Sequence, residues 1–205
     1  MARWKKGERT VQYLINKGRL ESIQAADLVG QAAALLERAS LRVGTTAAAA
    51  LAGGDVEGAY VAAYDGYRIG AESLLVQQGL RATRGDGSHM TVEEAVSAQF
   101  SSVITAFAKP TFERFRRTRH SAQYFDPKAA PITEADASWA IGKATAAVSG
   151  IRRLLAESPP GRFVSSLVVR QVELEQGAAG DSVVKGSGAC FQPFGAADRR
   201  LDGSA

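Results

Sequence analysis

The chain has 205 residues, of which 45% are hydrophobic, and its formal net charge is +4. This composition is typical of a soluble globular protein, and no apolar run approaches the roughly 20 residues that a membrane-spanning helix needs. The one cysteine, Cys190, excludes an intramolecular disulfide and fits a reducing compartment. The polar N-terminus has no apolar signal-peptide core, so a cytoplasmic protein without a membrane association is expected.

Two helical segments are predicted in the first quarter of the chain. Residues 1–23 are expected to form an N-terminal arm, with Gly18 placed to end its short helix. The first long helix is predicted over about residues 24–51, because leucine, valine and alanine recur there at spacings of three and four. Gly44 is expected to weaken the middle of this helix.

The next segments combine helix signals with a polar loop. Asp55 is a good N-cap for a second helix, which is predicted to end near residue 78. Residues 81–90 are rich in glycine and polar side chains, and they are predicted to form a loop. Thr91 and Glu94 match a capping box for a third helix, which is expected to continue to Phe107 before Pro110 stops it.

The remaining periodic segments complete a helical bundle. A fourth helix is predicted within residues 112–126, and a fifth begins with Thr133 as its N-cap and continues to Leu155. The sequence thus predicts an all-α fold, an antiparallel bundle of about five helices over residues 24–157. A weakly structured tail is expected over residues 158–205, where glycine, alanine, serine and aspartate come to dominate.

The polar chemistry of the chain is concentrated in residues 112–126, which hold four arginines and one of the two histidines. Arg116 and His120 are four residues apart on one predicted helix and share a face, while Arg114 and Arg117 share another. Guanidinium groups bind phosphate well, and a histidine moves protons near neutral pH. The run therefore predicts a site for an RNA backbone, with a solvated basic helix face as the alternative.

Other classes of site lack support in the sequence. The chain has no alternating strand and helix pattern for a nucleotide-binding α/β fold, no metal-ligand spacing and no G-x-S-x-G motif. Asp65 and Arg68 are three residues apart on the second helix, and they are interpreted as an exposed ion pair. His89 is interpreted as a residue that caps or packs against the third helix.

Several short segments between about residues 24 and 156 resemble one known family. They are Gly54-Asp-Val-Glu-Gly-Ala-Tyr60, Tyr64-Asp-Gly-Tyr-Arg68, Gln78-Gly-Leu-Arg81 and Arg116-Arg-Thr-Arg-His-Ser-Ala-Gln-Tyr124. As a set they resemble the HEPN domains (higher eukaryotes and prokaryotes nucleotide-binding). These are all-α bundles, many of which are metal-independent ribonucleases, including toxins paired with nucleotidyltransferase-like antitoxins.

The resemblance implies a site made of an arginine, a neighbouring polar residue and a histidine four to six residues further on. In one register Arg119 and His120 form the pair, and Tyr124 stands at the histidine position. In the other register Arg114 is the arginine and His120 is the histidine. The resemblance thus implies catalytic roles for Arg119, His120 and Tyr124, and RNA contacts by Arg114, Arg116, Arg117 and Asp65.

Three functions are compatible with these patterns. The first is a metal-independent, cofactor-free endoribonuclease of the toxin or defence type, with RNA or a nucleotide as ligand. The resemblance also implies a homodimer and a nucleotidyltransferase-like antitoxin as partner. The second is a non-catalytic helical module that binds RNA, a nucleotide or a protein partner. The third is a purely structural helical dimer.

Overall fold

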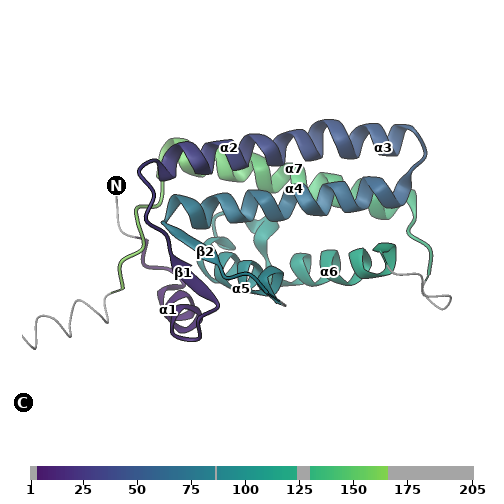
Figure 1. Ribbon diagram of the computed structural model, residues 1–205. Helices are drawn as coiled ribbons and strands as arrows, with labels where there is room; N and C mark the ends of the chain where they lie inside the picture. The colour runs from purple at the N-terminus through teal and green to yellow at the C-terminus, as the bar shows by residue number, and fades with distance from the viewer. Residues whose placement is uncertain (1–3, 86, 124–129, 166–205) are drawn as a thin grey trace, which may run out of the picture. The chain divides into compact units, whose positions relative to one another are not determined.

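The computed structural model describes residues 4–85, 87–123 and 130–165. These belong to one compact unit that ends at Ser165 (Figure 1). The elements in chain order are α1 (Glu8–Asn16), β1 (Leu20–Ser22), α2 (Leu28–Leu41), the π-helix η1 (Arg42–Ala47), α3 (Ala48–Ala52), α4 (Val56–Gln77), β2 (Leu80–Ala82), α5 (Ser88–Phe100), the 3-10 helix η2 (Thr105–Phe107), α6 (Lys109–Gln123) and α7 (Glu134–Glu157). The predicted all-α fold is confirmed.

The helix α4 lies at the centre of the bundle, with α2 and α3 along one side, α7 behind, and α5 and α6 along the other side (Figure 1). Asp55 caps α4 as predicted, because its carboxylate accepts a hydrogen bond from the Gly58 N–H at 2.8 Å. Alanine, glycine and tyrosine fill most buried positions of α4. The small residues let neighbouring helices approach closely, and the tyrosines fill the space between them.

The first long helix is confirmed, because α2, η1 and α3 follow one another without a break. It begins at Leu28, and the carboxylate of Asp27 accepts from the Gly30 N–H at 2.7 Å. Gly44, which was expected to weaken this helix, lies within the π-helical turn η1. Such turns are rare and occur mostly as local insertions within α-helices.

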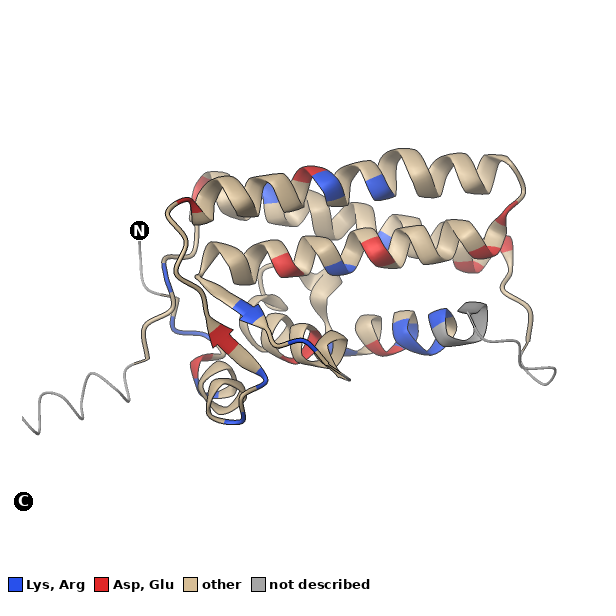
Figure 2. Ribbon diagram, viewed as in Figure 1, with Lys and Arg blue, Asp and Glu red and all other residues tan. Residues whose placement is uncertain are grey.

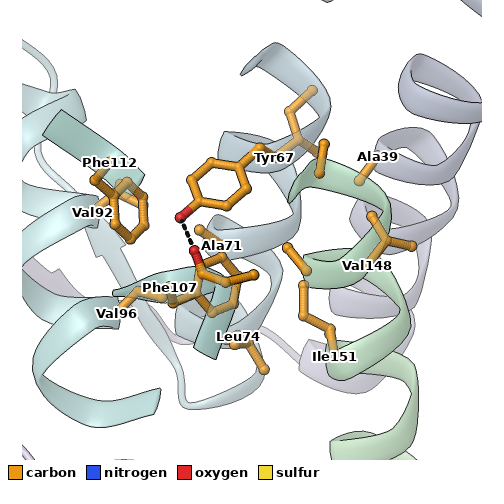
Figure 3. Close-up of a cluster of buried hydrophobic side chains, with 14 of the residues drawn as sticks. Ala39, Tyr67, Ala71, Leu74, Val92, Val96, Phe107, Phe112, Val148 and Ile151 are labelled. Carbon is orange, nitrogen blue, oxygen red and sulfur yellow. Dashed lines mark hydrogen bonds between the residues drawn. The ribbon is translucent and has the colours of Figure 1, made fainter. Parts of the chain in front are cut away.

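The core between α4, α6 and η2 is aromatic (Figure 3). The ring of Tyr67 lies 4.8 Å from that of Phe112 and 4.6 Å from that of Phe115, measured between centroids. The Tyr67 hydroxyl donates to the Ala106 carbonyl oxygen at 2.7 Å. The hydroxyl is the only polar group of this fully buried side chain, and the bond satisfies it. Burial of the ring therefore stabilises the core without leaving a hydrogen-bond donor unpaired.

The third helix begins and ends earlier than predicted. It starts at Ser88, directly after Gly87, so the predicted capping box at Thr91 is wrong. The Thr91 hydroxyl instead donates to the Gly87 carbonyl oxygen from inside the helix. The helix ends at Phe100, and the following turn places Ile104 against Gly150 of α7. Pro110 then lies in the first turn of α6, where its missing N–H costs little.

Two short strands are a further departure from the prediction. Leu20–Ser22 pairs with Leu80–Ala82 in an antiparallel ladder. The predicted loop at 81–90 is therefore wrong at both ends, because its first residues belong to a strand and its last residues to α5. The N-terminal segment contributes Val11 and Leu14 to the main core, and the Trp4 indole N–H donates to the Gln99 carbonyl oxygen at 3.2 Å. Pairing between segments 60 residues apart leaves no periodic signal in the sequence.

The C-terminal helix follows the prediction closely. Thr133 caps α7, and a reciprocal bond to Asp136 completes a capping box. After α7 the chain returns across the bundle, where the Phe163 N–H donates to the Gln78 carbonyl oxygen at 2.9 Å. The rest of the predicted tail, residues 166–205, lies outside the described residues. No helix in the described part of the chain is long and apolar enough to cross a membrane.

Substituting Gly66 by alanine is expected to destabilise the protein by about 1–3 kcal/mol, because the core there has no room for a methyl group. A Cβ at Gly66 would lie 2.5 Å from Val43 Cγ2 and 3.0 Å from the Ala39 carbonyl oxygen. The matched control is Gly142 in α7, where a Cβ would meet nothing within 4 Å. Gly142→Ala is expected to stabilise the helix by about 0.5–1 kcal/mol. Urea unfolding of both variants checks the sign of each effect.

Candidate functional site

Two of the predicted RNA-binding arginines hold helices together. The Arg114 guanidinium lies 3.9 Å from the centroid of the Trp139 ring and 3.0 Å from the Asp136 carboxylate, both on α7. Arg116 pairs with Glu93 of α5 at 2.8 Å. Removing either arginine would therefore loosen the packing of α6. Arg117 lies on the same helix with an exposed side chain.

Arg119 lies over the central helix. Its guanidinium carbon is 5.0 Å from the centroid of the Tyr64 ring, and the ring itself is buried in the face of α4. The Nε atom of Arg119 is buried and has no hydrogen-bond acceptor within the described structure. A donor that is buried without an acceptor costs about 1–3 kcal/mol. An anion that accepted this hydrogen bond would recover that cost.

Arg68, on α4, has an Nε of the same kind, unpaired within the described structure. It pairs with Glu72, one turn further along the helix, so the predicted pair with Asp65 is wrong. The i,i+4 spacing brings Arg68 and Glu72 onto the same face, and the single basic position of α4 lies between acidic ones (Figure 2). The Nε of Arg68 is also buried without an acceptor among the described residues. Asp65 is partly exposed nearby, and it has no ion-pair partner in the described part of the chain.

His89 completes the group, although no sequence pattern predicts its position there. It lies in the first turn of α5, and its ring centroid is 6.3 Å from that of Tyr64. We call Arg68, His89 and Arg119, grouped around Tyr64, the Arg-His cluster. The packing of α5 and α6 against α4 brings the histidine to the two arginines, and this packing has no local sequence signal.

The cluster keeps its histidine neutral. The His89 side chain is exposed at the surface, but neighbouring groups remove part of its hydration. This desolvation lowers the pKa of His89, and the positive charges of Arg68 and Arg119 lower it further, while Asp65 opposes them weakly. Burial also raises the pKa of the Tyr64 phenol, which therefore stays protonated. Near pH 7 the cluster thus offers two permanent cations and one neutral imidazole. Such a set can bind an oxyanion and accept a proton beside it.

Of the three predicted catalytic residues, the structure describes the side chain of Arg119 alone. Arg119 belongs to the cluster, and His120 follows it in α6. The side chain of His120 and the whole of Tyr124 lie outside the residues that the structure describes. Among the described side chains, no three His, Cys, Asp or Glu residues converge as a set of metal ligands.

The fold and the site define an all-α bundle with a cationic cluster beside its central helix. No protein-family model matches the chain, and no curated protein or solved structure matches it. The resemblance to HEPN domains therefore stays a prediction from the sequence. Functional inference depends on the residues of the cluster and on their chemistry.

The titration of His89 is expected to have a midpoint below the ordinary histidine value of about 6.5. The cause is partial desolvation by neighbouring groups, together with the two nearby guanidinium groups. Replacing Arg119 by alanine removes one positive charge, so the midpoint should move up. NMR of the histidine ring protons over a pH series measures both, and a His120→Ala variant identifies the His89 signal. A wild-type midpoint at or above 6.5 would contradict this electrostatic account.

Proposed function

We propose that the protein is an RNA-directed helical protein that binds the phosphate backbone of single-stranded RNA at the Arg-His cluster and cleaves it without a metal ion. The observation that carries the proposal is the pair of buried Nε donors on Arg68 and Arg119, both without an acceptor among the described residues and both beside a neutral histidine. A phosphate oxygen is the acceptor that two guanidinium groups fit best. The HEPN resemblance of the sequence supports the same chemistry.

The cleavage step follows from these groups. His89 accepts the proton of a ribose 2′-hydroxyl, and the 2′ oxygen attacks the adjacent phosphorus. Arg68 and Arg119 donate to the non-bridging oxygens as negative charge develops there. The bond to the 5′ oxygen breaks, and this leaving oxygen takes up a proton, a role that the family resemblance assigns to His120 or Tyr124. The products carry a 2′,3′-cyclic phosphate and a 5′-hydroxyl.

A non-catalytic RNA-binding protein is the second candidate. It is favoured by the ion pairs of Arg114 and Arg116, because these arginines of the predicted motif serve helix packing. The same cluster would then hold the backbone without cutting it. Binding in this case is still electrostatic, so the affinity would fall as salt rises.

Fluorescence anisotropy with a labelled single-stranded RNA separates the two candidates, if the labelled strand is examined afterwards on a denaturing gel. Both candidates predict salt-sensitive binding that weakens in Arg68→Ala and Arg119→Ala. Arg153→Ala is the matched control, because Arg153 is an exposed arginine on α7. Cleavage in the presence of EDTA supports the enzyme, and binding of intact RNA supports the binding module. Absence of binding to varied RNAs at low salt would overturn both.

A further inference from the structure

A pocket of about 250 Å³ is connected to the Arg-His cluster through its wall residue Glu72, which is the ion-pair partner of Arg68. Its apolar wall comes from Leu35 of α2, Leu75 of α4 and Leu80 of β2. Polar groups from Glu72, Thr83 and Ser88 also line it. The pocket therefore combines an apolar interior with a few hydrogen-bonding groups, as small-molecule sites in proteins do.

Glu72 joins this pocket to the cluster. It lines the pocket and also pairs with Arg68 through Oε1, which leaves Oε2 to accept another hydrogen bond. The two residues are one helical turn apart, about 6 Å along the helix axis. If the anionic group of a ligand binds Arg68, the part of the ligand next to that group would therefore lie near Glu72 and the apolar wall of the pocket.

We propose that the pocket receives one nucleobase of the RNA strand whose phosphate lies on the Arg-His cluster, and that Glu72 selects bases with an exocyclic amino group. In a nucleotide the ribose joins the base to the phosphate. A phosphate site and a base site on successive turns of one helix therefore fit the two ends of a nucleotide. The apolar wall covers the face of the base, and a carboxylate accepts from an amino group such as N4 of cytosine. Uracil has no exocyclic amino group. This proposal rests on the proposed RNA function.

Charge complementarity favours this occupant over an apolar peptide. The pocket wall also includes Arg84 and Arg81, which pairs with Glu21 at 2.6 Å. Arg38 of α2 acts electrostatically on Glu72. A strand that enters the pocket therefore passes cationic groups, which suit a phosphodiester backbone. In the proposed complex, the carboxylate of Glu72 faces the amino group of the base.

The test compares the affinities of short oligocytidylate and oligouridylate strands of equal length for the full chain. Wild type is expected to bind the cytidine strand about tenfold more tightly, within the range known for a good base contact. Glu72→Gln keeps the size of the side chain but adds a donor, so the ratio of the two affinities should fall toward one. Leu35→Trp narrows the pocket and should lower the same ratio. Circular dichroism confirms that both variants fold.

The outcomes distinguish the two proposals. If wild type binds neither strand, the proposed function fails. If it binds both strands equally and Arg119→Ala weakens both, the RNA function stands and the base pocket is wrong. A preference for cytidine that survives in both Glu72→Gln and Leu35→Trp would also overturn the pocket. A uniform change of both affinities in Glu72→Gln, with their ratio unchanged, would show that Glu72 does not select the base and would overturn its proposed role.

Discussion

Replacing Arg119 by alanine is expected to lower the rate of RNA cleavage by about 10²–10³-fold, the usual loss when one preorganised donor to a developing oxyanion is removed. The guanidinium lies 5.0 Å from the Tyr64 ring, with its buried Nε free of any acceptor in the described structure. The side chain therefore lies against an aromatic surface, and because it is partly exposed, a ligand can approach its guanidinium. The rate of cleavage of a labelled single-stranded RNA under single-turnover conditions measures the loss.

Two further variants sharpen this prediction. Arg119→Lys keeps the charge but loses the planar donor fork, so it should restore only part of the rate. Arg153→Ala removes an equal charge from an exposed position on α7 and should leave the rate unchanged. Equal rates for wild type and Arg119→Ala would show that Arg119 does not act on the reacting phosphate.

Replacing Phe115 by alanine is expected to lower the free energy of unfolding by about 3–5 kcal/mol, the usual cost of deleting a buried aromatic ring. Phe115 is fully buried. Its ring contacts Tyr64 and Tyr67 of α4 and Trp139 of α7, with centroid distances of 5.8, 4.6 and 5.0 Å. The substitution therefore leaves a cavity where α4, α6 and α7 meet.

Urea unfolding followed by circular dichroism measures this loss. Tyr13→Ala is the control, because Tyr13 is 51% exposed, and such surface changes usually stay within about 0.5 kcal/mol. Since the Tyr64 ring is close to both Phe115 and Arg119, the Phe115 variant should also weaken RNA binding. A loss of stability below that of Tyr13→Ala would mean that the aromatic core does not hold α6 in place.

The long helices could be predicted because their signals are local. The segments that form α2 to α3, α4 and α7 have apolar side chains at helical spacing over many turns, and Asp55 and Thr133 mark two of the starts. Each of these signals acts within a few residues along the chain. Tertiary packing therefore only reinforces what the local sequence already favours.

Distant contacts explain the errors. The strand Leu20–Ser22 exists because it pairs with Leu80–Ala82, and neither segment has a strand pattern of useful length. The third helix ends at Phe100, although apolar residues continue at helical spacing to Phe107. There the contact of Ile104 with α7 and the hydrogen bond to the Ala106 carbonyl oxygen favour a turn.

The site was predictable only as a segment. The run of arginines identified α6, and Arg119 does join the cluster. Sequence spacing does not predict which arginines form ion pairs with carboxylates on other helices, as Arg114 and Arg116 do. It also could not bring His89 next to Arg119, because that proximity depends on how α5 packs against α4.

The most direct test of the central claim is an analysis by mass spectrometry of the ends formed when purified protein is incubated with single-stranded RNA and EDTA. The account predicts fragments with a 2′,3′-cyclic phosphate and a 5′-hydroxyl, with strongly reduced amounts from Arg119→Ala and His89→Ala and full amounts from Arg153→Ala. Intact RNA with the wild-type protein, or equal fragmentation by all four proteins, would contradict it.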